Sequence, residues 1–259
     1  MSGLDPDLQR LLRRLKLGAL APTLPERCAL ARAQSLDYAA FLTVILADEV
    51  QRRDGQRLER KLAAAGFEER AALEDFDWSA PVGLDRRHLD QLFSLHFLAR
   101  REHVIFVGPV GVGKTFIAQA LGTAAVRAGH SVLFRRVDVL LRELGQARAD
   151  HSFEAQFRRY LAPDLLILDD FGIHRLSQQQ SEDLYALIIE RHRRSSFVVT
   201  SNREVSEWQA LFADPILANS ALDRLASGAH QLVIEGPSYR TRRRPELAEG
   251  LRAESLREG

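Results

Sequence analysis

Glycines, a lysine and a threonine between residues 108 and 115 (GPVGVGKT) have the spacing of a phosphate-binding loop, G-x-x-x-x-G-K-[ST]. The glycines let backbone N–H groups curl around phosphate oxygens, and a helix starting here adds partial positive charge. We expect Lys114 to reach the β- and γ-phosphates of a triphosphate and the Thr115 hydroxyl to help hold Mg²⁺. The residues predicted to contact the nucleotide are Gly108, Pro109, Val110, Gly111, Val112, Gly113, Lys114, Thr115 and Phe116.

The surroundings of this loop favour phosphate binding over a chance glycine-rich turn. An apolar stretch precedes it at 104–107, and a helical apolar pattern follows it and ends near Gly129. The only lysines of the chain are Lys16, Lys61 and Lys114, whereas arginine is abundant. A compact ammonium suits this position better than a planar guanidinium. We therefore predict nucleotide binding.

Two carboxylates follow a second apolar stretch, at Asp169 and Asp170. We expect the strand that ends here to lie beside the strand of the phosphate loop, so that both side chains emerge next to the γ-phosphate. Asp169 would then orient Mg²⁺, and Asp170 would polarise the attacking water. The alternative is an Asx turn after an ordinary strand. The loop upstream favours the magnesium interpretation.

Two further residues fit the same site. Asn202 follows a buried stretch at 197–200, where an amide can hold the lytic water or a γ-phosphate oxygen, although it could equally be a turn or helix-cap residue. Arg224 lies among apolar positions of a predicted helix. An arginine supplied across a subunit boundary can raise a transfer rate by about 10³–10⁵. Its alternative is a surface arginine paired with Asp223.

Composition sets broad limits on the class of protein. At 259 residues and 46% hydrophobic, the chain can bury an α/β core and a small second domain. The net charge of +1 leaves only local patches for nucleic-acid contacts. The single cysteine, Cys28, excludes an internal disulfide and a cysteine-based zinc site. No stretch has transmembrane length and the N-terminus lacks a signal pattern, so we expect a cytoplasmic protein without membrane contact.

The chain is expected to contain a helical domain at 1–73, a linker at 74–84, an α/β domain at 85–245 and a disordered tail at 246–259. The third helix of the first domain is expected to be capped by Ser35, and its basic distal part could be a solvated face or a DNA contact. Phe76 and Trp78 should pack on the next domain. Strands are predicted at 103–107, 131–134, 165–168, 197–200 and 230–234, with two helices, 137–145 and 153–161, between the second and third.

These motifs together resemble the IstB-like ATP-binding proteins, the helper ATPases of IS21-family transposons, which are related to the helicase loader DnaC within the AAA+ superfamily. The stretches that carry the resemblance are 108–115, 165–172 (LLILDDFG), 198–203 (VVTSNR), 206–208 with 214–215, 221–225 (ALDRL) and 236–240 (GPSYR). The resemblance implies a P-loop AAA+ domain with a mainly parallel five-stranded sheet, preceded by a small all-α domain. In this pattern Asp169 and Asp170 are the Walker B pair, Asn202 is sensor 1, and Arg224 is the finger acting on a neighbouring subunit.

The resemblance also implies a function. It predicts an ATP- and Mg²⁺-dependent ATPase that forms homo-oligomers through its ATP sites on duplex DNA and assists an IstA-like transposase. A DnaC-like helicase loader and a recruiting scaffold with little turnover remain alternatives. Asp170 is a methylene shorter than the glutamate of many AAA+ proteins, which predicts slow hydrolysis. Arg142 and Arg148 are candidate DNA contacts, and Arg240 is a candidate sensor 2.

Overall fold

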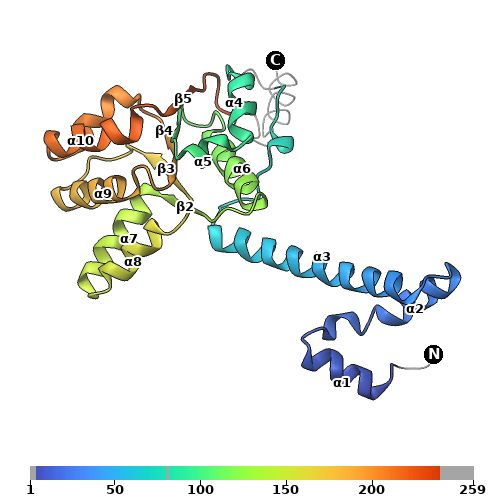
Figure 1. Ribbon diagram of the computed structural model, residues 1–259. Helices are drawn as coiled ribbons and strands as arrows, with labels where there is room; N and C mark the ends of the chain where they lie inside the picture. Colours follow the sequence, from blue (N-terminus) through green and yellow to red (C-terminus); the bar gives the residue numbers. More distant parts are fainter. Residues whose placement is uncertain (1–3, 80–81, 240–259) are drawn as a thin grey trace, which may run out of the picture. The chain divides into compact units, whose positions relative to one another are not determined.

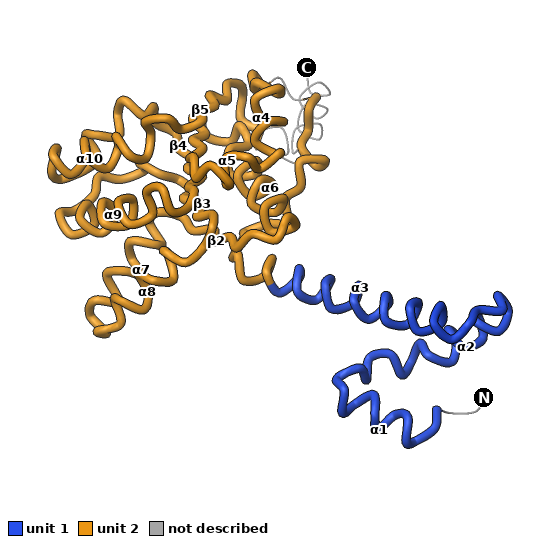
Figure 2. The backbone as a smooth tube through the Cα atoms, viewed as in Figure 1, with its two compact units in different colours: residues 1–60 blue, residues 61–259 orange. Residues whose placement is uncertain are grey.

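The chain forms two compact units in this computed structural model, which describes residues 4–79 and 82–239. The first unit comprises residues 1–60 and the second residues 61–259 (Figure 2). The division between the two units falls between Arg60 and Lys61, and the expected helical domain at 1–73 stays a prediction. The expected tail at 246–259 and the candidate Arg240 lie outside the described residues.

The described part of the first unit is entirely helical. Its elements are α1 (Pro6–Arg14), the 3₁₀ turn η1 (Gly18–Leu20), α2 (Leu24–Ala33) and α3 (Tyr38–Ala65), which continues into the second unit. Asp37, and not Ser35, caps α3, because the Asp37 carboxylate accepts a hydrogen bond from the Ala40 N–H at 2.7 Å. Ser35 has a left-handed backbone, with φ of 51°. The predicted cap was therefore wrong by two residues.

The second unit alternates strands and helices. In chain order its elements are η2 (Leu73–Asp75), α4 (Arg86–Phe93), α5 (His96–Arg100), β1 (Val104–Val107), α6 (Lys114–Arg127), β2 (Val132–Arg136), α7 (Val137–Ala149), α8 (Phe153–Leu161), β3 (Leu165–Phe171), α9 (Gln178–Arg191), β4 (Ser196–Ser201), η3 (Val205–Leu211), α10 (Pro215–Ala226) and β5 (His230–Val233). All five predicted strands are present, and α7 and α8 both lie between β2 and β3 as predicted.

The five strands form one parallel sheet in the order β2-β3-β4-β1-β5 (Figure 1). This confirms the expected α/β architecture. The expected neighbour of the phosphate-loop strand was wrong, because β4 lies between β1 and β3. The connection through α9 places β4 between β3 and β1. The composition of the strands does not predict this order. The end of β4 therefore lies between the phosphate loop and the two aspartates.

Helices cover both faces of the sheet. Helix α6 packs on β1 to β4 from one face, whereas α7 and α9 lie on the opposite side in Figure 1. Every residue of β1 and β4 is buried, which explains the apolar stretches at 104–107 and 197–199. Among the described helices, none combines the length and the apolarity needed to cross a membrane.

Candidate nucleotide-binding site

The phosphate loop connects the end of β1 at Val107 to the start of α6 at Lys114. Two of its glycines adopt left-handed backbone angles, with φ of 85° at Gly111 and 99° at Gly113. A Cβ at position 111 would lie 2.1 Å from the Ser238 Oγ, and one at 113 would lie 3.2 Å from the Phe76 ring. Conformation and close packing both require glycine at these positions. The glycine-rich loop therefore packs against two segments that are distant from each other in sequence, one at Phe76 and one at Ser238.

Lys114 lies at the centre of this loop and is 6% exposed. Its Nζ donates to the carbonyl oxygens of Gly108 at 2.7 Å and Pro109 at 2.6 Å, and to the Asn202 Oδ1 at 2.6 Å. These contacts hold the ammonium at the mouth of the loop, beside the end of β4. Lys114 and Asn202, 88 residues apart in sequence, are thus brought together.

A network of hydroxyl groups surrounds the Asp169 carboxylate. Its Oδ1 accepts hydrogen bonds from the Thr115 Oγ1 at 2.9 Å and from the Thr200 Oγ1 at 2.5 Å. The Thr200 oxygen in turn accepts the Asp170 N–H at 3.0 Å. Burial raises the pKa of the Asp169 carboxyl, and the two hydroxyl donors oppose that rise. Thr200 therefore orients both members of the aspartate pair.

The donor atoms at this site suit Mg²⁺ bound together with a nucleotide. Magnesium usually takes one or two protein oxygens and completes its shell with phosphate and water. The Thr115 hydroxyl and the Asp169 carboxylate supply two adjacent oxygens. No cluster of three or more His, Cys, Asp or Glu that could hold a metal occurs within the described residues. A metal at this site would thus depend on the nucleotide for most of its ligands.

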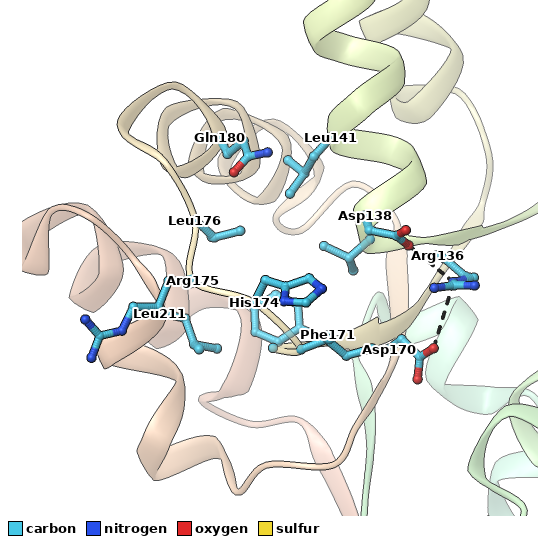
Figure 3. A pocket seen from close by; sticks show the side chains of 13 residues that line it. Arg136, Asp138, Leu141, Asp170, Phe171, His174, Arg175, Leu176, Gln180 and Leu211 are labelled. Carbon is cyan, nitrogen blue, oxygen red and sulfur yellow. Dashed lines mark ion pairs between the residues drawn. The ribbon is translucent and has the colours of Figure 1, made fainter. Parts of the chain in front are cut away.

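Asp170 lies just beyond the site, in a strained conformation. Its φ is 58°, and β3 is irregular between Leu168 and Phe171. The Arg136 Nε lies 3.9 Å from an Asp170 carboxylate oxygen and 3.2 Å from the Asp138 carboxylate. Figure 3 shows Arg136 between these two acids, at one side of a pocket that is also lined by the loop after β3. The Asp170 carboxylate thus has a cation near it, while its backbone N–H bonds Thr200.

The comparisons with known proteins decide the family. The family described as IstB-like ATP binding protein matches residues 10–247. The chain is also 42% identical to an ATP-binding protein of an insertion sequence from Mycobacterium tuberculosis, over 95% of this chain and 98% of that protein. The chain belongs to the IstB-like ATP-binding protein family. This IstB-like chain is therefore an ATP-binding protein associated with insertion sequences.

Solved structures support the fold of this IstB-like protein. The DnaI structure aligns with a TM-score of 0.54 at 21% identity, over 68% of this chain and 93% of that one. The replication initiator DnaA, bound to AMPPCP and single-stranded DNA, aligns with the same score at 19% identity, over 66% of this chain and 52% of that one. These likenesses support the α/β fold described above.

Arg224 makes its described contacts within its own helix of the IstB-like chain. It is a half-buried residue of α10, which Figure 1 shows on the opposite side of the sheet from α6. Its Nη1 donates to the Ser220 carbonyl and hydroxyl oxygens, each at 2.8 Å, within the same helix. The described contacts of Arg224 are thus with Ser220 rather than with Asp223.

Several arginines considered as DNA contacts have partners within the IstB-like chain. Arg52 and Arg53 both bind the buried Glu49 carboxylate at 2.7 Å. Arg148 pairs with the buried Asp183, and its guanidinium stacks 3.8 Å above the Phe153 ring. Intramolecular ion pairs of this kind leave fewer donors for phosphate. DNA contact by these residues stays a prediction.

Two parts of the site were not identified from the sequence. Thr200 was predicted only as the last residue of a strand. Its hydroxyl indicates a role at the site only once the strand order is known. The motif that contains Ser238 lies beside the phosphate loop, which the sequence does not indicate. The Tyr239 N–H donates a hydrogen bond to the Gly111 carbonyl at 2.8 Å. Phe76 was expected to pack on the second domain, and it does, with its ring centroid 6.0 Å from that of Phe116.

Proposed function

We propose that this IstB-like protein is a Mg²⁺-dependent ATPase whose nucleotide state controls assembly on duplex DNA and that it assists an IstA-like transposase. The observation that carries the proposal is a pair of hydrogen bonds at the start of α6: Lys114 bonds Asn202, and the adjacent Thr115 bonds Asp169. Each of these side chains suits triphosphate chemistry. A purely structural glycine turn would not need all four together.

In this proposal the residues divide the work. Lys114 exchanges its carbonyl partners for phosphate oxygens and neutralises their charge. Thr115 and Asp169 hold Mg²⁺, which supplies electrostatic stabilisation of the phosphates when it is bound. Asp170 accepts the proton of the attacking water, and Asn202 positions a γ-phosphate oxygen or that water. The strained backbone at Asp170 and its arginine neighbour favour slow turnover without DNA.

Homo-oligomers would form through the nucleotide. Because α10 lies away from α6 within one chain, Arg224 would act on the γ-phosphate of a neighbouring subunit. ATP would then hold two subunits together, and hydrolysis would weaken that contact. Each subunit adds a few arginine contacts to DNA phosphates, so multivalency can supply affinity although the net charge is only +1.

Two alternatives share the same nucleotide site. A DnaC-like helicase loader would act on single strands and a replicative helicase. A recruiting scaffold would bind ATP with little turnover. The insertion-sequence relative from Mycobacterium tuberculosis, which this chain matches over nearly its whole length, favours the transposition role. We also propose that residues 1–73, 74–84 and 85–245 act as helical domain, linker and ATPase domain.

The decisive experiment measures phosphate release by the full chain without DNA, with single strands and with long duplex. We expect duplex to stimulate turnover more than single strands do, and Lys114→Ala to abolish turnover and ATP-dependent assembly on duplex. Preferential stimulation by single strands would favour the helicase loader. ATP binding without stimulated release would favour the scaffold. Arg224→Glu should stop turnover while nucleotide binding by isolated subunits persists; unchanged turnover would overturn the role of Arg224.

A further inference from the structure

The turn that follows the aspartate pair is held by side chains at the end of β4. The Ser201 Oγ donates a hydrogen bond to the Phe171 carbonyl oxygen at 2.7 Å, and Ser201 is fully buried. The Arg203 Nε donates to the next carbonyl oxygen, that of Gly172, at 2.8 Å. Two successive carbonyl groups of the turn are thus bound by residues that lie two positions apart in the neighbouring segment.

The backbone of this turn needs such support. Asp170 and Gly172 both adopt left-handed angles, with φ of 58° and 87°. An aspartate in this region carries strain and persists there only when its surroundings hold it. Thr200 accepts the Asp170 N–H at 3.0 Å, and the contacts of Ser201 and Arg203 hold the two carbonyl groups that follow. The conformation of the residue proposed to activate water therefore depends on three side chains at the end of β4.

Arg203 is itself fixed through its backbone and its guanidinium group. Its N–H donates to the Ser201 Oγ at 3.1 Å, and its carbonyl oxygen accepts the Trp208 Nε1–H at 3.2 Å. Its Nη1 lies 3.6 Å from a carboxylate oxygen of Glu207. Trp208 is fully buried, with its ring centroid 4.3 Å from that of Phe171. Arg203 therefore has a defined position from which to hold the turn.

Asn202 lies between the two residues that hold the turn. Its side-chain oxygen accepts the Lys114 Nζ at 2.6 Å, while Ser201 before it and Arg203 after it bond the turn that follows β3. The Asn202 amide and the Asp170 carboxylate are the two groups proposed to act on the attacking water. This short segment thus joins the phosphate loop to the turn that contains the second aspartate.

We propose that Arg203 is a positioning residue for the hydrolytic step: its Nε holds the Gly172 carbonyl and so keeps Asp170 in the conformation that hydrolysis requires. This inference rests on the ATPase function proposed above. In this role Arg203 contacts neither nucleotide nor DNA phosphate, and its donor atom matters more than its charge. The charged end of the side chain pairs with Glu207, and because both side chains are about half exposed that ion pair is weak.

Two substitutions separate the donor from the charge. In glutamine the side-chain nitrogen is bonded to Cδ, as Nε is in arginine, so Arg203→Gln retains a donor at this place without the charge. Arg203→Met has a methyl group there and lacks both the donor and the charge. Arg194→Met is the matched control, because Arg194 is an exposed arginine with an ion pair of its own, to Glu190 at 3.0 Å.

Single-turnover phosphate release by the full chain at saturating ATP and Mg²⁺ tests the proposal. Because small displacements of catalytic groups are costly, we expect Arg203→Met to slow release by at least about tenfold. Its affinity for ATP should stay within about twofold of wild type, since the contacts of Lys114 are unchanged. Arg203→Gln and Arg194→Met should both remain close to wild type. Thermal melts check that all three variants fold.

Two results of this assay would overturn the proposal. A glutamine variant as slow as the methionine variant would show that the charge of Arg203 is required, as for a contact with phosphate. A methionine variant as fast as wild type would show that the contact with Gly172 is dispensable.

Amide hydrogen exchange of the full chain without nucleotide tests the hold on the turn separately from turnover. Arg203→Met should speed the exchange of the amides at 170–173 by at least about tenfold, whereas Arg203→Gln should not. Unchanged exchange in the methionine variant would overturn the proposal even if turnover fell. A wild-type chain that releases no phosphate would instead refute the proposed ATPase function, whatever the exchange shows.

Discussion

The Nζ of Lys114 lies 2.6 Å from the Oδ1 of Asn202, so the ammonium of the phosphate loop is held by the amide that follows β4. β4 separates the loop strand from the strand of the two aspartates. Asn202 therefore contacts Lys114 from the end of the strand next to β1. A phosphate oxygen that enters the loop would compete with this amide and two carbonyl oxygens for the three donors of Lys114.

Replacing Asn202 should separate binding from turnover. In Asn202→Ala the lysine keeps two carbonyl partners, so we expect ATP affinity to change by less than about tenfold, the effect of one charge-assisted hydrogen bond. Turnover should fall further, because the amide would also be lost from the hydrolytic site. Equilibrium binding of a fluorescent ATP analogue and single-turnover phosphate release measure the two effects. Equal losses in both would contradict a role for Asn202 in the hydrolytic step.

Thr200→Val should damage the site without changing its shape. The substitution removes the hydroxyl that donates to Asp169 and accepts from the Asp170 N–H. Leaving these buried groups without a partner should cost about 1–3 kcal/mol in the free energy of unfolding, measured by urea denaturation. Thr200→Ser retains the hydroxyl and serves as the control. A valine variant as stable and active as the serine variant would show that the network is dispensable.

Arg136 should restrain Asp170. The two side chains are 43% and 33% exposed, so the ion pair contributes little to stability, below about 1 kcal/mol. Arg136→Ala frees the Asp170 carboxylate from a competing cation, and we expect DNA-independent turnover to rise a few-fold with little change in melting temperature. Arg136→Lys retains the charge and should resemble wild type. A fall in basal turnover in the alanine variant would refute this restraint.

Gly111→Ala should affect the loop through a clash as well as backbone strain. Its added methyl group would meet the Ser238 Oγ, while the left-handed backbone at Gly111 disfavours any side chain. Gly129→Ala is a matched control, since Gly129 has φ of 100° and open space around it. We expect the control to lose about 1 kcal/mol and Gly111→Ala to lose more, together with ATP binding. Thermal melts and nucleotide binding give both values.

Stability should fall in mild acid because of His103. Burial lowers the pKa of this imidazole from 6.5 to about 4, with help from the nearby His192 and Arg191. Between pH 6.5 and 4 the unfolded chain takes up a proton that the folded chain does not bind. His103 thus removes up to about 3 kcal/mol of stability across that range as the pH falls.

The matched variant for this pH effect is His103→Asn. The Nδ1 of His103 accepts the Phe197 N–H at 3.1 Å, and an asparagine oxygen can take the same place. Urea denaturation at several pH values should show a shallower loss of stability below pH 6.5 in the variant than in wild type. Parallel curves for the two proteins would exclude His103 as the titrating group.

The sequence was sufficient to predict the strands and the phosphate loop, because both have local signals. Apolar stretches and the glycine spacing located β1, β3 and the residues around Lys114. The order of the strands has no local signal, and the neighbour predicted for β3 was accordingly wrong. That error hid Thr200, whose importance comes only from its position between the loop and Asp169.

Other features depend on contacts that no spacing predicts. Ser35 and Asp37 are both good cap residues, and only the hydrogen bond to Ala40 distinguishes them. Asp170, which lies near Arg136, falls in the irregular part of β3 between Leu168 and Phe171, and no spacing predicts such an irregularity. The role of Arg224 was predicted only from the family resemblance, because its described contacts within the chain are with Ser220.

The loop at 108–113 is braced by Phe76 before it in the chain and by Ser238 and Tyr239 after it. A shortened protein meant to isolate the ATPase would lose one brace if it began after Phe76, and the other if it stopped at the end of β5. Either truncation would leave the glycines without the packing that shapes them. A minimal nucleotide-binding fragment must therefore include both of these flanking segments.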